Sequence, residues 1–359
     1  MRTEFEHFAR TRTGAYAPLY ARIGAVIAED DRLLELALGA REGQSRPDLL
    51  LAIVHDLLLR DEDQPLARFY PSITSHPDPG DPGEDFTAFC DTHRDLITER
   101  LAHRLVQTNE VGRCTFLAPA IATAAARRQN TPLALLEVGT SAGLNLFLDR
   151  FGYRYHHTPR PIAPGSNITV NEVAGDPVLH CELRGPGIPT WTPFTVTWRH
   201  GIDLNPLDIT DPDDRRWLRA LIWPDHRDRA QLLDNTLVAA LRNSTSREHT
   251  GRDGATSYRL HAGDAATLLE GIAAGAPRDA HLVIYHSAVL AHMTDEERDR
   301  FTAAVLQVSR QRPVSWVQAE PRQDRDPRRL RLSECQDGRV LSDLALGSYQ
   351  PHGHWLQWE

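Results

Sequence analysis

The chain has 359 residues, of which 41% are hydrophobic and 25% are charged. This length and composition allow a large buried core, so we expect one large domain or two smaller ones. The formal net charge is −9, which disfavours general binding to nucleic-acid backbones and suits a cationic substrate better.

The cysteines and the N-terminus bear on the cellular compartment. The four cysteines (Cys90, Cys114, Cys181 and Cys335) are widely spread and form no C-x-x-C pair, so we expect reduced, packed thiols. The first residues, "MRTEFEHFARTR", lack the apolar segment of a signal peptide. No apolar stretch approaches the length that a membrane span needs. We therefore expect a soluble, cytoplasmic protein that binds neither membrane nor nucleic acid.

Residues 1–130 have the pattern of a helical region or cap. Apolar residues recur there every three or four positions, which is the period of an amphipathic helix. The clearest segments are "LYARIGAVIAEDDRLLELAL", "RPDLLLAIVHDLLLR" and "THRDLITERLAHRLVQT". Between them, "YPSITSHPDPGDPGEDF" is rich in Pro, Gly and Asp and is predicted to be a loop.

Residues 131–359 alternate short apolar runs with helical segments. This alternation predicts an α/β domain with a doubly wound, mostly parallel, Rossmann-like sheet covered by helices on both faces. The tail "GSYQPHGHWLQWE" alternates aromatic and polar residues and predicts a final antiparallel edge strand. The charged segment "PRQDRDPRRLRL" is expected to form a solvated loop.

The segment "LALLEVGTSAGLNLF" predicts a strand, a tight turn and a helix. Its small residues Gly139, Ser141 and Gly143 would let a ligand approach the backbone, and the N–H groups near Asn145 would favour an anion. Glu137, at the end of the strand, could accept hydrogen bonds from an ammonium or hydroxyl group. An ordinary packed turn explains the motif alone equally well.

Three later strands also end in polar residues, and ligands of open α/β sheets bind at that edge. These residues are Asp203, Asp264, and the group Tyr285, His286 and Ser287. His286 is the candidate base because an imidazole titrates near neutral pH. Alternatively, Asp264 caps a helix and His286 is a buried strand histidine. Since side chains alternate along a strand, Tyr285 and His286 should point to opposite faces.

The segment "QTNEVGR" places Asn109, Glu110 and Arg113 between the helical region and the sheet, where they could face the ligand or hydrogen-bond the junction. Tyr70 is a further candidate for lining the cleft that would hold this ligand. The pairs His156–His157 and His352–His354 do not have the spacing of a metal site, so we expect no metal.

The ordered strand ends resemble those of class I S-adenosylmethionine (SAM) methyltransferases. The matching elements are the acidic glycine loop at Glu137, the acid Asp203 in the place of a ribose ligand, "GDA" at Asp264 and the polar end at His286. Two departures weaken SAM binding. Ser141 replaces the middle glycine, and Asp203 lies 60 residues beyond Gly143, where about 20 is usual. An insertion at about 156–193, such as a hairpin over the pocket, would account for that distance.

Nearly the whole chain resembles a bacterial domain-of-unknown-function family with a methyltransferase-like fold. The similar stretches include "APLYARIGAVIAED", "QTNEVGR", "LLEVGTSAGLNLFLDRFGY" and "VIYHSAVLAHM". The best-understood members resemble enzymes of azabicyclic amino-acid (azinomycin-type) antibiotic biosynthesis, which close an aziridine ring by internal displacement. The resemblance implies a small-molecule amine substrate, which an acidic carrier protein could hold, a possible partner subunit and no cofactor.

Three functions follow as hypotheses. The first is a cofactor-independent enzyme that closes an aziridine-type ring on an amino-acid-derived amine, with loss of a sulfate- or phosphate-type group. The second is a SAM-dependent N- or O-methyltransferase, and the third is a non-catalytic partner subunit. In the first, Glu137, His286 and Asp203 hold the ammonium and move its proton. The turn from Ser141 to Asn145 binds the leaving anion.

Overall fold

The computed structural model describes residues 1–14, 16–128, 131–157, 168–244, 258–320 and 328–359. They form two compact units. One comprises residues 1–108 and 209–234, and the other comprises residues 109–208 and 235–359. The described helices include none with the length and apolar character needed to cross a bilayer. All four cysteines are free and buried.

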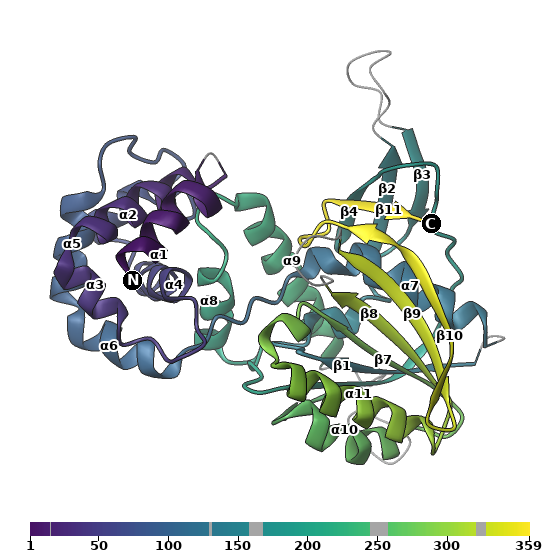
Figure 1. The fold of residues 1–359 in the computed structure, drawn as a ribbon. Helices are drawn as coiled ribbons and strands as arrows, with labels where there is room; N and C mark the ends of the chain where they lie inside the picture. The colour runs from purple at the N-terminus through teal and green to yellow at the C-terminus, as the bar shows by residue number, and fades with distance from the viewer. Residues whose placement is uncertain (15, 129–130, 158–167, 245–257, 321–327) are drawn as a thin grey trace. The chain divides into compact units, whose positions relative to one another are not determined.

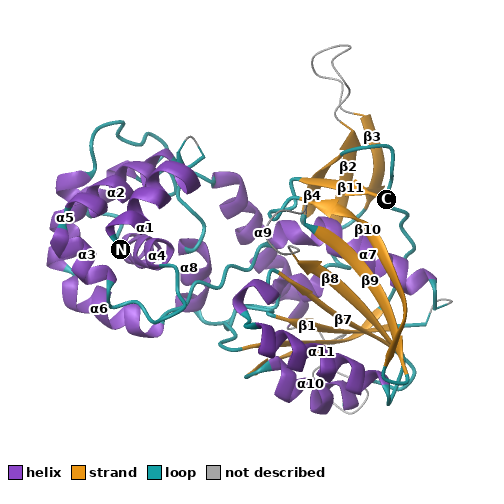
Figure 2. Cartoon of the chain, in the orientation of Figure 1, coloured by secondary structure: helices purple, strands orange, loops and turns teal. Residues whose placement is uncertain are grey.

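The first unit is helical (Figure 2). Helix α4 lies at its centre, with a nearly continuous run of buried residues that includes Leu49, Ile53 and Leu57. The regularly spaced apolar residues of this segment thus form a helix that is buried on most sides. The elements are α1 (Arg2–His7), η1 (Phe8–Thr13), α2 (Pro18–Glu29), α3 (Asp31–Ala37), α4 (Arg46–Arg60), η2 (Pro65–Phe69), α5 (Gly83–Thr92), α6 (Arg94–His103) and α8 (Pro212–Ala220).

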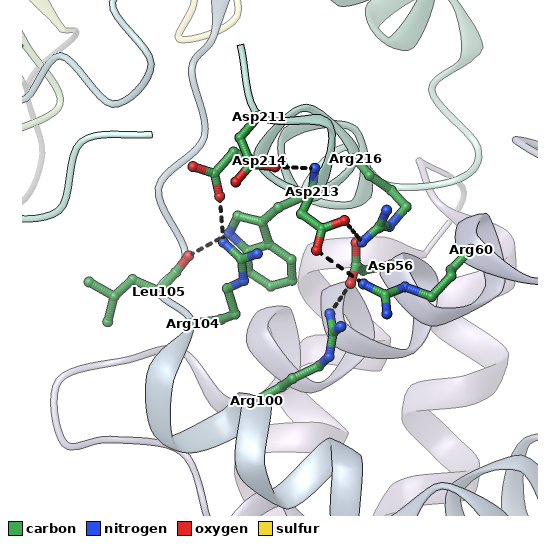
Figure 3. A network of polar contacts seen from close by, with 10 residues as sticks. Asp56, Arg60, Arg100, Arg104, Leu105, Asp211, Asp213, Asp214 and Arg216 are labelled. Atoms are coloured by element: carbon green, nitrogen blue, oxygen red, sulfur yellow. Dashed lines mark hydrogen bonds and ion pairs between the residues drawn. The ribbon is translucent and has the colours of Figure 1, made fainter. Parts of the chain in front are cut away.

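A buried ion network joins α8 to the N-terminal helices (Figure 3). Asp56 of α4 is completely buried and pairs with Arg100 of α6 and with Arg216 of α8. The Arg216 Nε donates to Asp56 at 2.9 Å, and Arg216 also pairs with Asp213 at 2.9 Å. Two guanidinium groups therefore neutralise one buried carboxylate, which explains why residues 209–234 belong to this unit.

The second unit contains one sheet of eleven strands within the described residues. Its order is β3-β2-β4-β11-β10-β9-β8-β7-β1-β5-β6. The segment β8-β7-β1-β5-β6 is parallel throughout, and antiparallel pairs join β9 to β8 and β10. The strands are β1 (Leu133–Val138), β2 (Gly152–His157), β3 (Ile168–Val173), β4 (Val178–Leu183), β5 (Val196–Asp203), β6 (Tyr258–Ala262), β7 (His281–Ser287), β8 (Val314–Glu320), β9 (Arg329–Gln336), β10 (Arg339–Tyr349) and β11 (Trp355–Trp358).

Helices cover both faces of this sheet, as the sequence predicts. On one face, α10 (Ala265–Ala274) and α11 (Asp295–Ser309) pack side by side (Figure 1). Their apolar residues Leu269 and Phe301 share a core with Leu136 of β1 and Ile284 of β7. On the other face, α7 (Cys114–Ala126) packs against β4, β8 and β9. Helix α9 (Arg227–Ser244) runs from the helical unit into the α/β unit.

Several expectations change in the structure. The predicted edge position of the tail is wrong, because β11 lies between β4 and β10 inside the sheet. Of the insertion expected at about 156–193, residues 158–167 lie outside the described residues, and the strands on either side of them, β2 and β3, pair antiparallel. The described part of the insertion extends the sheet as β2, β3 and β4. Residues 109–128 lie with the α/β unit, rather than with the helical region that we expected to reach residue 130. In the charged segment 321–332, residues 321–327 lie outside the described residues, and β9 begins at Arg329.

Candidate functional site

The central strands place their carboxyl ends together at one edge of the sheet. From β1, the chain order runs to β5 and β6 on one side and to β7 and β8 on the other. The strand order therefore reverses between β1 and β7, and open α/β sheets bind ligands at such a reversal. The turns after β1 and β7 are consequently the candidate site.

The turn after β1 is built from residues with left-handed backbones. Gly139, Ser141 and Gly143 have φ of 72°, 52° and 71°. A Cβ at Gly139 would lie 2.2 Å from the Val289 side chain, and one at Gly143 would lie 2.8 Å from the Tyr258 hydroxyl. Both glycines thus permit close packing of the chain's own side chains. Ser141 has no such freedom, so its conformation is strained.

The element expected to present N–H groups to an anion at this turn is shorter than predicted. The helix predicted after the turn is a single 3-10 turn (Leu144–Phe147). Two backbone donors at this turn have partners within the protein. The Leu144 N–H donates to Asn109 Oδ1 at 3.0 Å, and the Ser141 N–H donates to Asp203 Oδ2 at 2.8 Å. Asn109 and Asp203 therefore brace the turn.

Glu137 lies beneath this turn and is only 2% exposed. Its carboxyl group accepts hydrogen bonds from Thr140 Oγ1 at 2.8 Å and from Asn145 Nδ2 at 3.4 Å. Burial raises its pKa to about 8, although those two hydrogen bonds and the Arg113 charge oppose the rise. Glu137 therefore carries a proton at neutral pH, and a cation placed beside it would favour the ionised form.

Tyr285 and His286 lie on opposite faces of β7, as their alternation predicts. Tyr285 is paired with Glu137, and its hydroxyl donates to the Asn145 carbonyl at 3.3 Å. His286 lies on the α11 face, where its ring contacts Phe301 and its Nδ1 lies 2.7 Å from Glu320 Oε1. Glu137 and His286 are thus on opposite sides of the sheet, and the structure does not bring these two candidates together.

The turn after β7 is also strained and is held from both sides. Ala288 has φ of 56°, which a residue with a Cβ rarely adopts. On one side, Glu320 Oε1 accepts the Val289 N–H at 2.8 Å. On the other, Arg113 Nη1 donates to the Ser287 carbonyl at 3.0 Å and to its hydroxyl at 3.3 Å. Strain at the two turns that flank the reversal points to function at this edge.

Asp264 has a structural role, as its alternative interpretation allows. It caps α10 by accepting hydrogen bonds from the Thr267 N–H and hydroxyl, and it pairs with Arg300 at 2.9 Å. The Thr267 hydroxyl contributes most to lowering the Asp264 pKa. Asp203 is similarly occupied, because its two oxygens accept the N–H groups of Ser141 and Asn205. Asp203 and Asp264, the two acids that would hold a nucleoside cofactor, thus both accept hydrogen bonds from backbone N–H groups.

Glu110 and Arg113 come together with a residue that has no functional signal of its own in the sequence. Glu110 Oε2 lies 2.7 Å from Nδ1 of His352, in the turn between β10 and β11. Arg113 Nε donates to the carbonyl of Pro351 at 3.4 Å. In the sequence, His352 is notable only for its spacing to His354, and 242 residues separate it from Glu110, so no local pattern could have joined them.

Glu320 is a second residue that the sequence analysis misses. It ends β8, the fifth parallel strand. Polar residues at the ends of the other parallel strands are candidates by their position, and the same rule would include Glu320.

Tyr70 lies in the helical unit, apart in the chain from the other candidates. It is fully buried beside the rings of Tyr20 and His55. Among the described residues, its hydroxyl has no hydrogen-bond partner. The role of Tyr70 as a ligand-lining residue stays a prediction.

A known protein family matches nearly the whole chain. The family described as "Uncharacterized protein conserved in bacteria (DUF2332)" matches residues 2–358. No curated protein and no solved structure matches the chain. The described residues also contain no group of three or more His, Cys, Asp or Glu side chains suited to a metal ion.

Proposed function

The chain belongs to this family, DUF2332, and for this member we propose a small-molecule enzyme that closes an aziridine-type ring. The substrate is an amino-acid-derived amine that carries its own sulfate- or phosphate-type leaving group. The site is the edge formed by the turns after β1 and β7. The strand order supports a Rossmann-like, methyltransferase-like core, because the five parallel strands, numbered along the chain, lie in the order 3-2-1-4-5.

The observation that carries the proposal is the environment of Glu137. Its pKa of about 8 lies close to neutral pH, which suits a group that takes and releases a proton. Arg113 is the cation that acts on Glu137, and it also contacts Ser287. A buried acid beside a guanidinium group can hold an ammonium group and an anionic ester of one small molecule.

The chemistry of the proposed step balances within the substrate and these residues. The ammonium group promotes ionisation of Glu137, and the carboxylate then takes one proton from it. The amine lone pair forms the new N–C bond while the C–O bond to the ester breaks. The leaving sulfate or phosphate keeps the bonding pair and is stabilised by Arg113. The ring nitrogen then loses its second proton, so the reaction needs two proton acceptors.

The hydrogen bonds of two acidic residues support a reaction without a nucleoside cofactor. Asp203 and Asp264 would be the ligands of SAM, but they already hold the β1 turn and the start of α10. The residues present therefore do not fit the cofactor as its ligands. His286 has no proton-transfer role in this proposal, because it is buried on the opposite face beside Phe301.

The test is an assay of the full chain with 2-amino sulfate and 2-amino phosphate esters. Inorganic sulfate or phosphate is measured by ion chromatography and the cyclic amine by mass spectrometry. We expect both products in equal amounts, and loss of both in Glu137→Gln. The exposed Glu296→Gln serves as the matched control and should keep wild-type turnover. Calorimetric binding of SAM or S-adenosylhomocysteine, with no product from any ester, would contradict the proposal.

A further inference from the structure

The paired residues Glu110 and His352 have the geometry of an acid–base dyad. The Glu110 side chain is 5% exposed, whereas that of His352 is 31% exposed. Glu110 Oε2 lies 2.7 Å from His352 Nδ1, and Glu110 Oε1 accepts the Gly112 N–H at 3.3 Å. A carboxylate at Nδ1 favours the tautomer with the proton on that nitrogen. The Nε2 lone pair is then available to take a proton.

The backbone around the dyad is fitted closely enough to fix its geometry. A Cβ at Gly112 would lie 2.0 Å from the His352 carbonyl oxygen, and one at Gly353 would lie 1.9 Å from the Gly112 carbonyl oxygen. Gly353 also has φ of 77°. The Thr115 hydroxyl bridges the two segments, at 2.8 Å from the Gly112 oxygen and 3.1 Å from the Gly353 oxygen. Two glycines thus allow two distant segments to meet and hold His352 against Glu110.

Arg113 connects this dyad to the site at Glu137. Its Nε binds the carbonyl of Pro351, the residue before His352, and its Nη1 binds Ser287. Within the described residues, Nη2 of Arg113 and Nε2 of His352 make no hydrogen bond. Arg113 can therefore donate to an anion, and His352 can accept a proton, at a contact that joins Arg113 to the residue before His352.

We propose that His352, oriented by Glu110, is a catalytic base of this site and that Arg113 binds the anionic group of the substrate beside it. This inference rests on the proposed function and deepens it. Glu137 takes the first proton from the substrate nitrogen, and His352 Nε2 takes the second after the ring closes. The buried Glu137 and the partly exposed His352 thereby divide the two proton transfers.

The test is alkylation of the full chain by bromoacetate, which needs no turnover. The His352 Nε2 lone pair forms a bond to the CH₂ carbon, and bromide departs with the electron pair of the C–Br bond. Peptide mass spectrometry gives the rate at His352 and at His180, an exposed histidine of β4 that serves as an internal control. Uncharged bromoacetamide reports reactivity without the attraction of the carboxylate to Arg113.

We expect bromoacetate to modify His352 ~10-fold faster than His180 and ~10-fold faster than bromoacetamide does, since Arg113 concentrates the anion. Arg113→Met should abolish the preference for bromoacetate, and Glu110→Gln should slow both reagents at His352. Equal rates at the two histidines, or a preference that survives in Arg113→Met, would overturn the inference. If a variant does not fold, the comparison of reagents and histidines in the wild type decides.

The alkylation result and the turnover assay can fail independently. Selective alkylation without product from any ester would keep the dyad and reject the ring-closing reaction. Product formation with unselective alkylation would keep the reaction and remove His352 from it.

Discussion

Replacing Glu137 by glutamine should change how stability depends on pH. The Glu137 pKa rises from its ordinary 4.5 to about 8 because the carboxyl group is buried. Between those values the unfolded chain is ionised while the folded chain holds the proton. Stability from this group is therefore fully present below pH 4.5 and is lost as pH rises towards 8. The glutamine side chain would be uncharged throughout and has nearly the same shape as the protonated acid.

The size of the effect follows from the shift. Each pH unit between the two pKa values is equivalent to about 1.4 kcal/mol, so the interval from pH 5 to pH 8 gives about 4 kcal/mol. Glu137→Gln should therefore gain about 4 kcal/mol of unfolding free energy, relative to wild type, across that interval. Because the side chain is almost fully buried, solvent screening does not reduce this figure much.

The assay is urea unfolding at each pH unit from 5 to 9, followed by tryptophan fluorescence. Two compact units can unfold in separate steps, so the transition that shifts with Glu137→Gln is assigned to the α/β unit. The control is Glu296→Gln, which replaces an exposed glutamate of α11 and should follow the wild type at every pH. A constant difference between Glu137→Gln and wild type from pH 5 to pH 8 would refute the assignment of a raised pKa.

Three further predictions concern contacts within the two units. Asp56→Asn leaves two arginines without their buried carboxylate and should cost ~3–5 kcal/mol in urea unfolding, whereas the exposed Asp213→Asn should cost little. Burial lowers the His55 pKa to about 4, so the helical unit should lose up to ~3 kcal/mol as pH falls from 6.5 to 4; in His55→Gln, calorimetric melting should show a smaller loss. Ala288→Val puts a β-branched residue at φ of 56° and should cost ~1–3 kcal/mol by thermal melting, while Ala288→Gly should cost nothing. Unchanged urea unfolding in Asp56→Asn, an unchanged thermal melt in Ala288→Val, or a pH dependence that His55→Gln leaves intact would count against the corresponding contact.

Local patterns predicted the elements of the sheet and the caps of its helices. The segment that ends in Tyr285, His286 and Ser287 became β7, which is buried along its whole length, and Asp264 caps α10, as one of its two interpretations allows. Alternation along β7 correctly separated Tyr285 from His286. It could not say which of them shares a face with Glu137, because that depends on the register between β1 and β7.

Long-range contacts account for what the sequence could not predict. Residues 209–234 have the local pattern of the sheet region, but Arg216 pairs with Asp56, 160 residues earlier, and the segment joins the helical unit. The tail has the pattern of an edge strand, but it lies within the sheet and its preceding turn brings His352 to Glu110. Neither contact leaves a periodic signal in the sequence, since each depends on two segments that meet only in the folded chain.

The most direct test of the central claim is the proton count when an unreactive substrate analogue binds. We would titrate the full chain with 2-aminoethanesulfonate, whose anion cannot be displaced, by calorimetry at pH 7 in buffers of different ionisation enthalpy. Because Glu137 is about nine-tenths protonated at that pH and ionises beside the ammonium group, binding should release about one proton. Glu137→Gln should release none. Binding with no proton release by the wild type, or the same release by both proteins, would contradict the proposed role of Glu137.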